Sequence, residues 1–415
     1  MQMQTSTTET QLNKRVLKLS AVALAAGLAA GAAQAQSSVT LYGIVDTGIG
    51  YQNNQAPALG ATSGGHASTK MINGIWSGSR FGMKGSEDLG GGTKAIFTLE
   101  EGFNSATGAM AVSGLAFNRQ AFVGLTDARL GTFTAGRQYT AYYTLLSPWS
   151  PTTWLTGAFG AHPGDIDSLD TNYRANNSFV YMSPTIGGLT LGGSYSIGGE
   201  PGSFNAGSTW SAAAQYKNGP LGIAAGIQRV NNSAEGGGAW GSFSTVSNAG
   251  GQPAVSALNN GYQLAQAQQR IAVTGGWQFT PSFDISVSYS NVQYVPGVNS
   301  KFASEAVFNT YGAVLHWKAT PALDLAGGYS YTKAAKANGV TDGAQYQQIV
   351  FSQYYSLSKR TAFYVLEAFT RANGQTLNAS GAVINATATV GDGFNGTPSA
   401  SRNLFAAGAG IVHRF

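Results

Sequence analysis

The stretch "IAVTGGWQFTPSFDISVSYS", residues 271–290, alternates apolar and polar side chains on both sides of a short link. In residues 283–290 the odd positions carry Phe, Ile, Val and Tyr, whereas the even positions carry Asp and three Ser. Alternation with a period of two over eight to ten residues predicts a β-strand with one apolar and one polar face. The Thr-Pro-Ser link between the two runs is typical of a tight turn. The stretch therefore predicts two strands joined by a short turn.

The same pattern recurs along the chain, for example at residues 189–197 and 323–332. Short, turn-rich links lie at 88–92, 127–131, 184–188, 218–221, 280–282, 320–322 and 358–360. Longer polar stretches lie between them, at about 53–73, 105–116, 139–175, 198–207, 231–269, 295–304, 334–344 and 372–401. Seven tight turns that alternate with eight long loops require sixteen strands. Short turns on one side and long loops on the other are typical of an all-β antiparallel transmembrane barrel and not of a soluble sandwich.

Composition agrees with a membrane barrel. Charged residues make up only 10% of the chain, against about 25% in average soluble proteins. Cysteine is absent, and after residue 35 no apolar stretch approaches the roughly 18–20 residues that a spanning helix needs. Strands, and not helices, are therefore expected to cross the membrane.

The first 35 residues predict a cleaved signal peptide. Lys14, Arg15 and Lys18 precede an apolar run at 21–33. The run is followed by the small-residue cleavage motif Ala-Gln-Ala at 33–35. Cleavage after Ala35 would leave a barrel domain of residues 36–415. That domain has 20 basic and 17 acidic residues, a formal charge of +3. The charge is dispersed, so no nucleic-acid partner is expected.

The chain ends in "AGIVHRF", residues 409–415, which places Ile411, His413 and Phe415 on one face of a strand. Every backbone polar group in lipid needs a partner, so a spanning sheet must close on itself. The last strand is therefore expected to pair with the first, residues 37–51. Phe415 and Ile411 would then lie among the outward apolar residues at the rim and form a terminal signal for the machinery that assembles barrels.

Several stretches resemble the Gram-negative general diffusion porins, in particular the trimeric sixteen-stranded porins of β-proteobacteria. They are "SSVTLYGIVDTGIGY" (37–51), "GSRFGMKGSEDLGGGTKAIFTLEEGFN" (78–104), "FNRQAFVGL" (117–125), "GTFTAGRQY" (131–139) and the final Phe. The resemblance covers essentially the whole chain after the signal peptide. It implies a homotrimer in the outer membrane, in contact with lipid and lipopolysaccharide. It also implies a third external loop that folds inward and narrows a water-filled channel for ions and small hydrophilic solutes.

Candidate charges for such a constriction lie in two parts of the chain. Residues 140–174 form a stretch too long for a passive connection, and it carries Asp165, Asp167 and Asp170. Arg80 and Lys84 alternate with Phe81 and Met83, so they are expected to face away from lipid.

Two further arginines are assigned by the resemblance. The alternation around Arg119 is ambiguous, and the family pattern places it inside the pore. The same pattern places Arg174 just after the constriction loop. The resulting hypothesis is a wall of Arg80, Arg119 and Arg174 that faces the three aspartates, in which opposed charges steer polar solutes. The alternative is that these arginines form structural ion pairs or lie at the rim.

Arg137 shares parity with Phe133 and Ala135, which are expected to face outward. In the resembled family this region meets a neighbouring subunit, so Arg137 is predicted to contact another copy. The alternative is an interfacial arginine that binds lipid headgroups.

Other functions receive less support. A substrate-selective channel of the same fold remains an alternative because Trp149 and Trp154 lie in the third loop. An enzyme would need a serine and a histidine on one barrel face, and an adhesin would need a large passenger region; the sequence indicates neither. Residues 165–170 lack the glycine and glutamate of a calcium loop, so no metal or other cofactor is expected. The sequence leaves anion or cation selectivity open.

Overall fold

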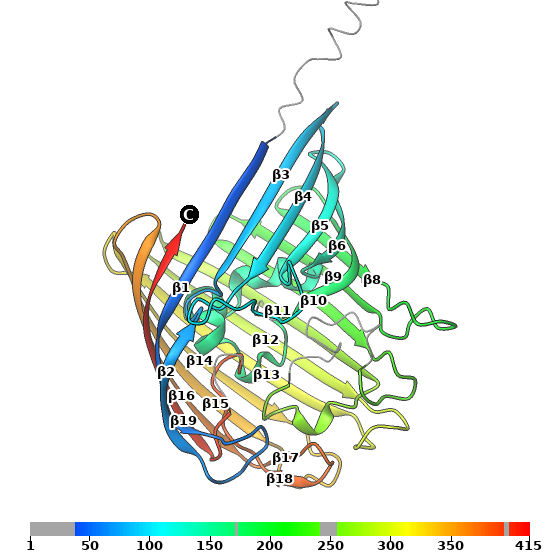
Figure 1. The fold of residues 1–415 in the computed structure, drawn as a ribbon, viewed down its shortest axis with the longest axis vertical. Coiled ribbons are helices and arrows are strands. Elements are labelled where there is room, and N and C mark those ends of the chain that lie inside the picture. Colours follow the sequence, from blue (N-terminus) through cyan, green and yellow to red (C-terminus); the bar gives the residue numbers. More distant parts are fainter. Residues whose placement is uncertain (1–37, 171–172, 241–254, 394–397) are drawn as a thin grey trace, which may run out of the picture.

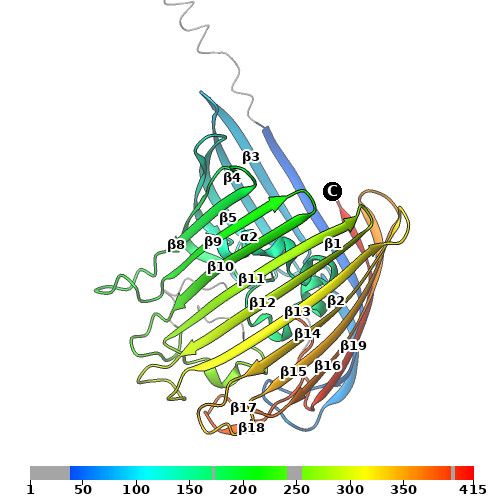
Figure 2. The ribbon, with the colours of Figure 1, turned by 180° about the vertical axis from the view of Figure 1, so that it is seen from behind.

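The computed structural model describes residues 38–170, 173–240, 255–393 and 398–415, which form a β-barrel (Figures 1 and 2). The predicted signal peptide, residues 1–35, lies outside the described residues. None of the described helices is long and apolar enough to cross a membrane.

The strands follow one another around the barrel in chain order. They are β1 (Ser38–Gln55), β2 (His66–Asn73), β3 (Arg80–Gly90), β4 (Thr93–Gly102), β5 (Gln120–Asp127), β6 (Gly131–Gln138), β7 (Ala175–Met182), β8 (Leu189–Ser196), β9 (Thr209–Asn218), β10 (Leu221–Asn231), β11 (Ala267–Thr280), β12 (Phe283–Val295), β13 (Ala306–Lys318), β14 (Leu323–Ala334), β15 (Gln345–Ser356), β16 (Thr361–Asn373) and β19 (Asn403–Arg414). A small hairpin, β17 (Gln375–Leu377) and β18 (Val383–Asn385), lies in the last long loop.

Both β2 and β3 pair with β1, β3 with its first half and β2 with its second. They therefore make one strand interrupted at residues 74–79, and the barrel of described residues has sixteen antiparallel strands. The predicted fold is confirmed. One boundary differs, because residues 66–73 of the expected first long loop form β2.

The seven predicted short links all lie at turns between consecutive strands, and the predicted long stretches join strands at the other end. Figure 1 shows the C-terminus on the side that carries the short turns and the β17–β18 hairpin at the opposite end. All long connections therefore share one end, where they can cover or enter the barrel.

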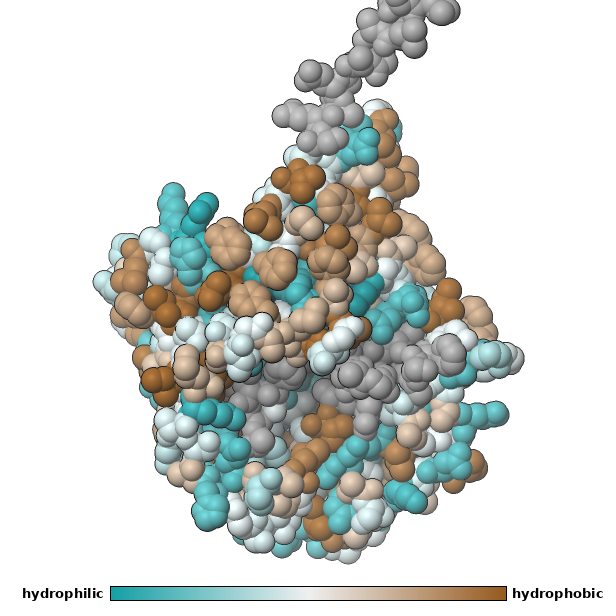
Figure 3. Space-filling model, in the orientation of Figure 1, coloured by the Kyte–Doolittle hydropathy of each residue, from teal (hydrophilic) through white to brown (hydrophobic). Residues whose placement is uncertain are grey.

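Alternation sorts the side chains between lipid and lumen. Val287 and Tyr289 of β12 are exposed on the outer surface, whereas Ser286, Ser288 and Ser290 are buried inside. Figure 3 shows the side of the barrel that carries β1, with apolar residues gathered across its upper part and mostly hydrophilic ones below them. An apolar band with polar ends matches the thickness profile of a bilayer.

The barrel closes where β19 pairs with β1, and the predicted seam is confirmed. Phe415 and Gly43 exchange two backbone hydrogen bonds, both of 3.1 Å. A Cβ at Gly43 would lie 2.2 Å from the Phe415 ring, so only glycine lets the terminal ring pack here. Ile411 and Phe415 are 38% and 45% exposed on the outer surface.

The third long connection, residues 139–174, is called loop 3 here. It holds five short helices: α2 (Ala141–Leu146), η1 (Ser147–Trp149), α3 (Thr152–Leu155), η2 (Thr156–Gly160) and η3 (Pro163–Asp165). Figures 1 and 2 show these helices within the ring of strands. Another short helix among the described residues, η5 (Asn260–Tyr262), lies in the connection between β10 and β11.

Side chains of the wall hold loop 3 inside the barrel. Trp149 packs over the lumen face of Gly222, where a Cβ would approach the indole to 1.8 Å. Trp154 stacks on His316 of β13, with ring centroids 3.4 Å apart. Gln348 of β15 donates to the carbonyl of Ala161 at 2.9 Å. Loop 3 is therefore packed across the lumen against the wall that carries β10, β13 and β15.

Candidate pore constriction

A cavity of about 690 Å³ lies beside loop 3 and is called the central cavity here. Four arginines from the strand side of the barrel contribute to its lining: Arg80, Arg119, Arg137 and Arg174. Two acidic residues from long loops also contribute, Asp170 of loop 3 and Asp392 of the last loop. The structure thus brings together all three predicted wall arginines and one of the three predicted aspartates.

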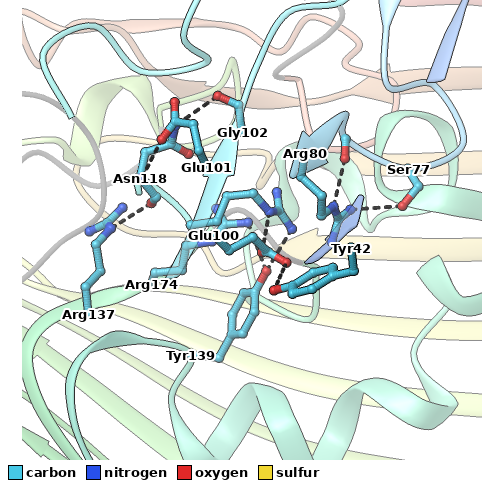
Figure 4. A network of polar contacts seen from close by, with 12 residues as sticks. Tyr42, Ser77, Arg80, Glu100, Glu101, Gly102, Asn118, Arg137, Tyr139 and Arg174 are labelled. Carbon is cyan, nitrogen blue, oxygen red and sulfur yellow. Dashed lines mark hydrogen bonds and ion pairs between the residues drawn. The ribbon is translucent and has the colours of Figure 1, made fainter. Parts of the chain in front are cut away.

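Arg80 is positioned by the interruption between β2 and β3. Its guanidinium donates to the carbonyl of Gly78 at 2.8 Å and to the hydroxyl of Ser77 at 2.9 Å (Figure 4). Gly74 starts the interruption with φ +68°, and a Cβ there would lie 2.6 Å from the Cα of Gly78. The chain can therefore turn sharply here only with glycine.

A buried carboxylate on the neighbouring strand holds this turned segment. Asp46 of β1 accepts hydrogen bonds from the backbone N–H groups of Trp76 and Ser77, at 2.8 and 2.6 Å. It also accepts one from the hydroxyl of Tyr364. Asp46 is fully buried and lumen-facing. The sequence does not predict this role, because residues 74–79, whose N–H groups bond to Asp46, show no periodic pattern.

Arg119 precedes β5 and is buried next to Glu100 of β4. The Arg119 Nε lies 2.7 Å from Glu100 Oε1, and the Tyr42 hydroxyl donates to Oε2 at 3.0 Å (Figure 4). Sequence reasoning missed Glu100. The signal was present, because Thr98 and Glu100 alternate with the outward Phe97 and Leu99.

Tyr139 joins two of the arginines at the start of loop 3. Its hydroxyl accepts hydrogen bonds from Nη2 of Arg119 and from Nη2 of Arg174, each at 3.0 Å (Figure 4). The guanidinium carbon of Arg174 also lies 5.0 Å from the Tyr139 ring centre, within range of a cation–π interaction. Sequence reasoning did not single out Tyr139.

Arg137 keeps the predicted parity of its strand, because it pairs with Ala121 of β5 in the same row as the exposed Val123 and Leu125. Its guanidinium donates to the carbonyl of Asn118 at 2.6 Å and to the side chain of Asn176, and it contributes to the cavity lining. The register of β6 on β7 shifts here because one residue of β6 lies opposite two residues of β7, and the Arg137 side chain bonds to Asn118 and Asn176 at this irregular end of the sheet. Its role as a contact between copies stays a prediction.

Two of the three loop aspartates are not part of the cavity lining. The carboxylate of Asp167 contacts His162 Nδ1 at 2.5 Å and the Ser290 hydroxyl at 2.6 Å, and its side chain is fully buried. Asp165 lies in a tight turn and accepts from the backbone N–H of Asp170 at 3.0 Å. Asp165 and Asp167 therefore anchor the loop and do not face the cavity. The sequence could not indicate this, because residues in an irregular loop show no periodic pattern from which the direction of a side chain could be predicted.

The pKa directions of Asp165 and Asp167 agree with a role in anchoring the loop. Burial, reinforced by the carboxylates of Asp170 and Asp167, raises the pKa of Asp165 well above its usual range. Burial also raises the pKa of Asp167, but the charge of His162 and the hydrogen bonds it receives outweigh burial and lower it overall. Asp165 is therefore a poor source of negative charge for the pore.

The other predicted residues lie outside the central cavity. Lys84 faces away from lipid as expected, but it lies nearer the β3–β4 turn, with its ammonium 5.4 Å from the Tyr42 ring centre. Trp149 and Trp154 are packed against the wall, and neither is among the cavity-lining residues. The tryptophans therefore anchor loop 3 and form no aromatic path for a solute.

Asp392 reaches the cavity because the last long connection, residues 374–402 and called loop 8 here, also enters the barrel. The N–H of Asp392 donates to the carbonyl of Gly157 at 3.0 Å, and the N–H of Gly164 donates to that of Gly391 at 2.7 Å. Loop 8 is thereby bound to loop 3 by backbone hydrogen bonds. No pattern in the sequence indicates this docking.

A closed barrel with an apolar outer band and a charge-lined internal cavity defines a membrane pore. The chain belongs to the Gram-negative porin family, a model of which matches residues 20–375. It is 31% identical over 382 residues to an outer membrane porin protein of Bordetella pertussis, covering 85% of this chain and 94% of that protein. It is thus an outer-membrane channel and not an enzyme.

Solved structures share the fold. An anion-selective porin from Comamonas acidovorans superposes with a TM-score of 0.66 at 23% identity, covering 92% of this chain and 100% of that one. The trimer form of OmpT, an outer membrane protein of Vibrio cholerae, superposes with a TM-score of 0.61 at 15% identity, covering 91% and 99%. At these identities the likeness extends to the fold alone.

Proposed function

We propose that the central cavity is the constriction of a pore for passive diffusion of ions and small hydrophilic solutes, and that it favours anions. The observation that carries the proposal is the charge of the lining. Four arginines contribute to the lining, against two acidic residues, Asp170 and Asp392. Two more carboxylates lie behind the lining, Glu100 bonded to Arg119 and Glu101 bonded to Asn118. Cations therefore outnumber carboxylates in the lining itself.

The geometry supports a selective effect of these charges. The arginines are supplied by or beside the strands, and the two aspartates by loops 3 and 8. Groups fixed in a narrow, low-dielectric passage act on an ion more strongly than the same groups in bulk water. A small anion would therefore meet a favourable potential at the arginines, and hydrophilic solutes would exchange their water for polar contacts there.

Neutralising the arginines should reduce the anion preference. In planar bilayers with a salt gradient, Arg80→Gln and Arg119→Gln are each expected to lower the anion-to-cation permeability ratio by roughly two-fold or more, since each removes one fixed charge. Asp392→Asn should raise the ratio. Arg371→Gln is the matched control, because Arg371 of β16 is exposed and is not among the cavity-lining residues.

Unchanged reversal potentials in both arginine variants would remove the central cavity from the conduction path. Solute-dependent block of the conductance would instead favour a substrate-selective channel.

We also propose the assembly and export steps. Three copies would form the functional unit, with the outer surface in lipid and lipopolysaccharide and Arg137 near a neighbouring copy. The barrel-assembly machinery would recognise Phe415 and Ile411. Their side chains are exposed on the outer surface of the barrel where β19 pairs with β1. Residues 1–35 would be removed during export. Sedimentation of the purified protein in detergent should give a protein mass three times that of the processed chain; a monomer mass would contradict the trimer.

A further inference from the structure

Tyr139 occupies an unusual place between like charges. Its hydroxyl oxygen accepts two hydrogen bonds of 3.0 Å, one from Arg119 and one from Arg174 (Figure 4). Guanidinium groups repel each other, and a shared acceptor offsets that repulsion because hydrogen bonds from charged donors are strong. Neither arginine comes from the same element as Tyr139, since one precedes β5 and the other precedes β7.

The two arginines depend on Tyr139 to different degrees. Arg119 has a second anchor, its 2.7 Å ion pair with Glu100. Among the residues that the structure describes, the guanidinium of Arg174 donates to Tyr139, and its buried Nε has no partner. The direction of Arg174 in the cavity is therefore set mainly by Tyr139.

We propose that Tyr139 is a positioning residue that determines ion selectivity: its hydroxyl holds Arg119 and Arg174 together as one concentrated positive site in the central cavity. The inference rests on the proposed function and assigns part of the selectivity to a neutral side chain. Without the hydroxyl, Arg174 would swing away from Arg119, and the charge at the narrow point would spread out.

The same contacts make the site sensitive to alkaline pH. Burial raises the pKa of Tyr139, but the guanidiniums of Arg119, Arg174 and Arg80 outweigh burial and the opposing charge of Glu100 and lower it below the usual phenol value. Ionisation would place a negative charge between two arginines. The anion preference should then fall as the pH rises towards the usual phenol value.

One further titratable group faces Tyr139. Tyr143 of α2 lies beside it, with ring centroids 4.8 Å apart. Burial raises the pKa of Tyr143, so it stays neutral in the range in which Tyr139 would ionise.

Tyr139→Phe tests the inference in the full-length channel. Reversal potentials in a potassium chloride gradient should show the anion-to-cation permeability ratio falling roughly two-fold relative to the unmodified channel at about pH 7. The anion preference of the unmodified channel should fall as the pH approaches about 10, the usual phenol value, and that of Tyr139→Phe should not. A role limited to folding would leave no such difference in the pH profile.

Tyr354→Phe is the matched control. It removes another hydroxyl-to-arginine hydrogen bond, 2.7 Å from Arg414, on a residue that is not among those lining the cavity. Its permeability ratio and pH profile should equal those of the unmodified channel. A change as large as that of Tyr139→Phe would mean that any such loss disturbs the pore, and would overturn the specific role.

If Tyr139→Phe folds poorly, the pH profile of the unmodified channel still tests the inference, and a constant anion preference would overturn it. If Tyr139→Phe folds, a double variant tests whether Tyr139 acts through Arg174. If Tyr139 acts through Arg174, then Tyr139→Phe/Arg174→Gln should have the permeability ratio of Arg174→Gln alone, and additive losses would contradict the inference. If Arg119→Gln lowers anion preference and Tyr139→Phe does not, the inference fails and the proposed function stands. If neither arginine variant changes the ratio, the proposed function itself fails.

Discussion

Replacing Asp46 with alanine is expected to lower the free energy of unfolding by roughly 3 kcal/mol or more, because it leaves one buried and two half-buried donors without an acceptor. Those donors are the N–H groups of Trp76 and Ser77 and the hydroxyl of Tyr364. The same change should release the segment 74–79 and with it Arg80, whose guanidinium is held by Gly78 and Ser77. Stability and selectivity should therefore change together.

Urea unfolding of the protein in lipid vesicles would measure the first effect, and the reversal potential of the surviving channels would measure the second. Asp46→Asn should be milder, since an amide oxygen can still accept from the two N–H groups. Asp88→Asn is a control of the same chemical type at an exposed turn, where the side chain accepts only from Gly90 among the hydrogen bonds of the described residues. Equal stability of Asp46→Ala and the unmodified protein would contradict the proposed role of the buried carboxylate.

Asp167→Ala is expected to detach loop 3 from the opposite wall while the barrel stays folded. The change removes the contact with His162 and the hydrogen bond from Ser290. The buried His162 ring and the buried Ser290 hydroxyl lose this partner, and a buried polar group left unsatisfied costs roughly 1–3 kcal/mol. The segment around residues 162–167 is therefore expected to leave the wall first, while Gln348 still bonds to Ala161.

Limited digestion with chymotrypsin should show the detachment. Loop 3 contains Tyr142, Tyr143 and Trp149, which are protected while the loop is packed, so Asp167→Ala should be cut there and the unmodified protein should not. Ser288→Ala is the control, since it removes only the 3.2 Å contact between Ser288 and His162 and should remain protected. Protection of Asp167→Ala would mean that other contacts hold the loop.

The contact between Asp167 and His162 also predicts how acid affects loop 3. The pKa of Asp167 is lower in the folded protein than in the unfolded chain. A group with a lowered pKa stabilises the fold above its unfolded pKa, and that contribution is lost as the pH falls through the folded value. Cutting of loop 3 by an acid-stable protease should therefore increase only below about pH 4, the usual range of an aspartate.

The strands could be predicted because their side chains repeat every two residues. The alternation of Arg80 and Lys84 with Phe81 and Met83 placed both cations inside, where the structure has them. Arg137 has the outward parity that the alternation predicts, but its side chain also contributes to the cavity lining, which the alternation alone does not predict. Arg119 lies just outside β5, beyond the regular alternation of that strand, and its assignment needed the family resemblance.

The loops could not be predicted to the same degree. Asp165, Asp167 and Asp170 follow one another at close spacing, yet only Asp170 lines the cavity, because tight turns send the three side chains in different directions. Asp392 comes from a loop more than two hundred residues away in sequence, and only the tertiary structure brings it there. Glu100 is different, since the strand pattern already placed it inside.

The central claim is that a closed barrel encloses a water-filled path past the central cavity and its arginines. The most direct test is the current through a planar lipid bilayer to which the purified protein is added, with a salt gradient across the bilayer. We predict stepwise, ohmic conductance increments and a reversal potential with the sign of preferential anion flow. Absence of steps, or a reversal potential of the opposite sign, would contradict the account.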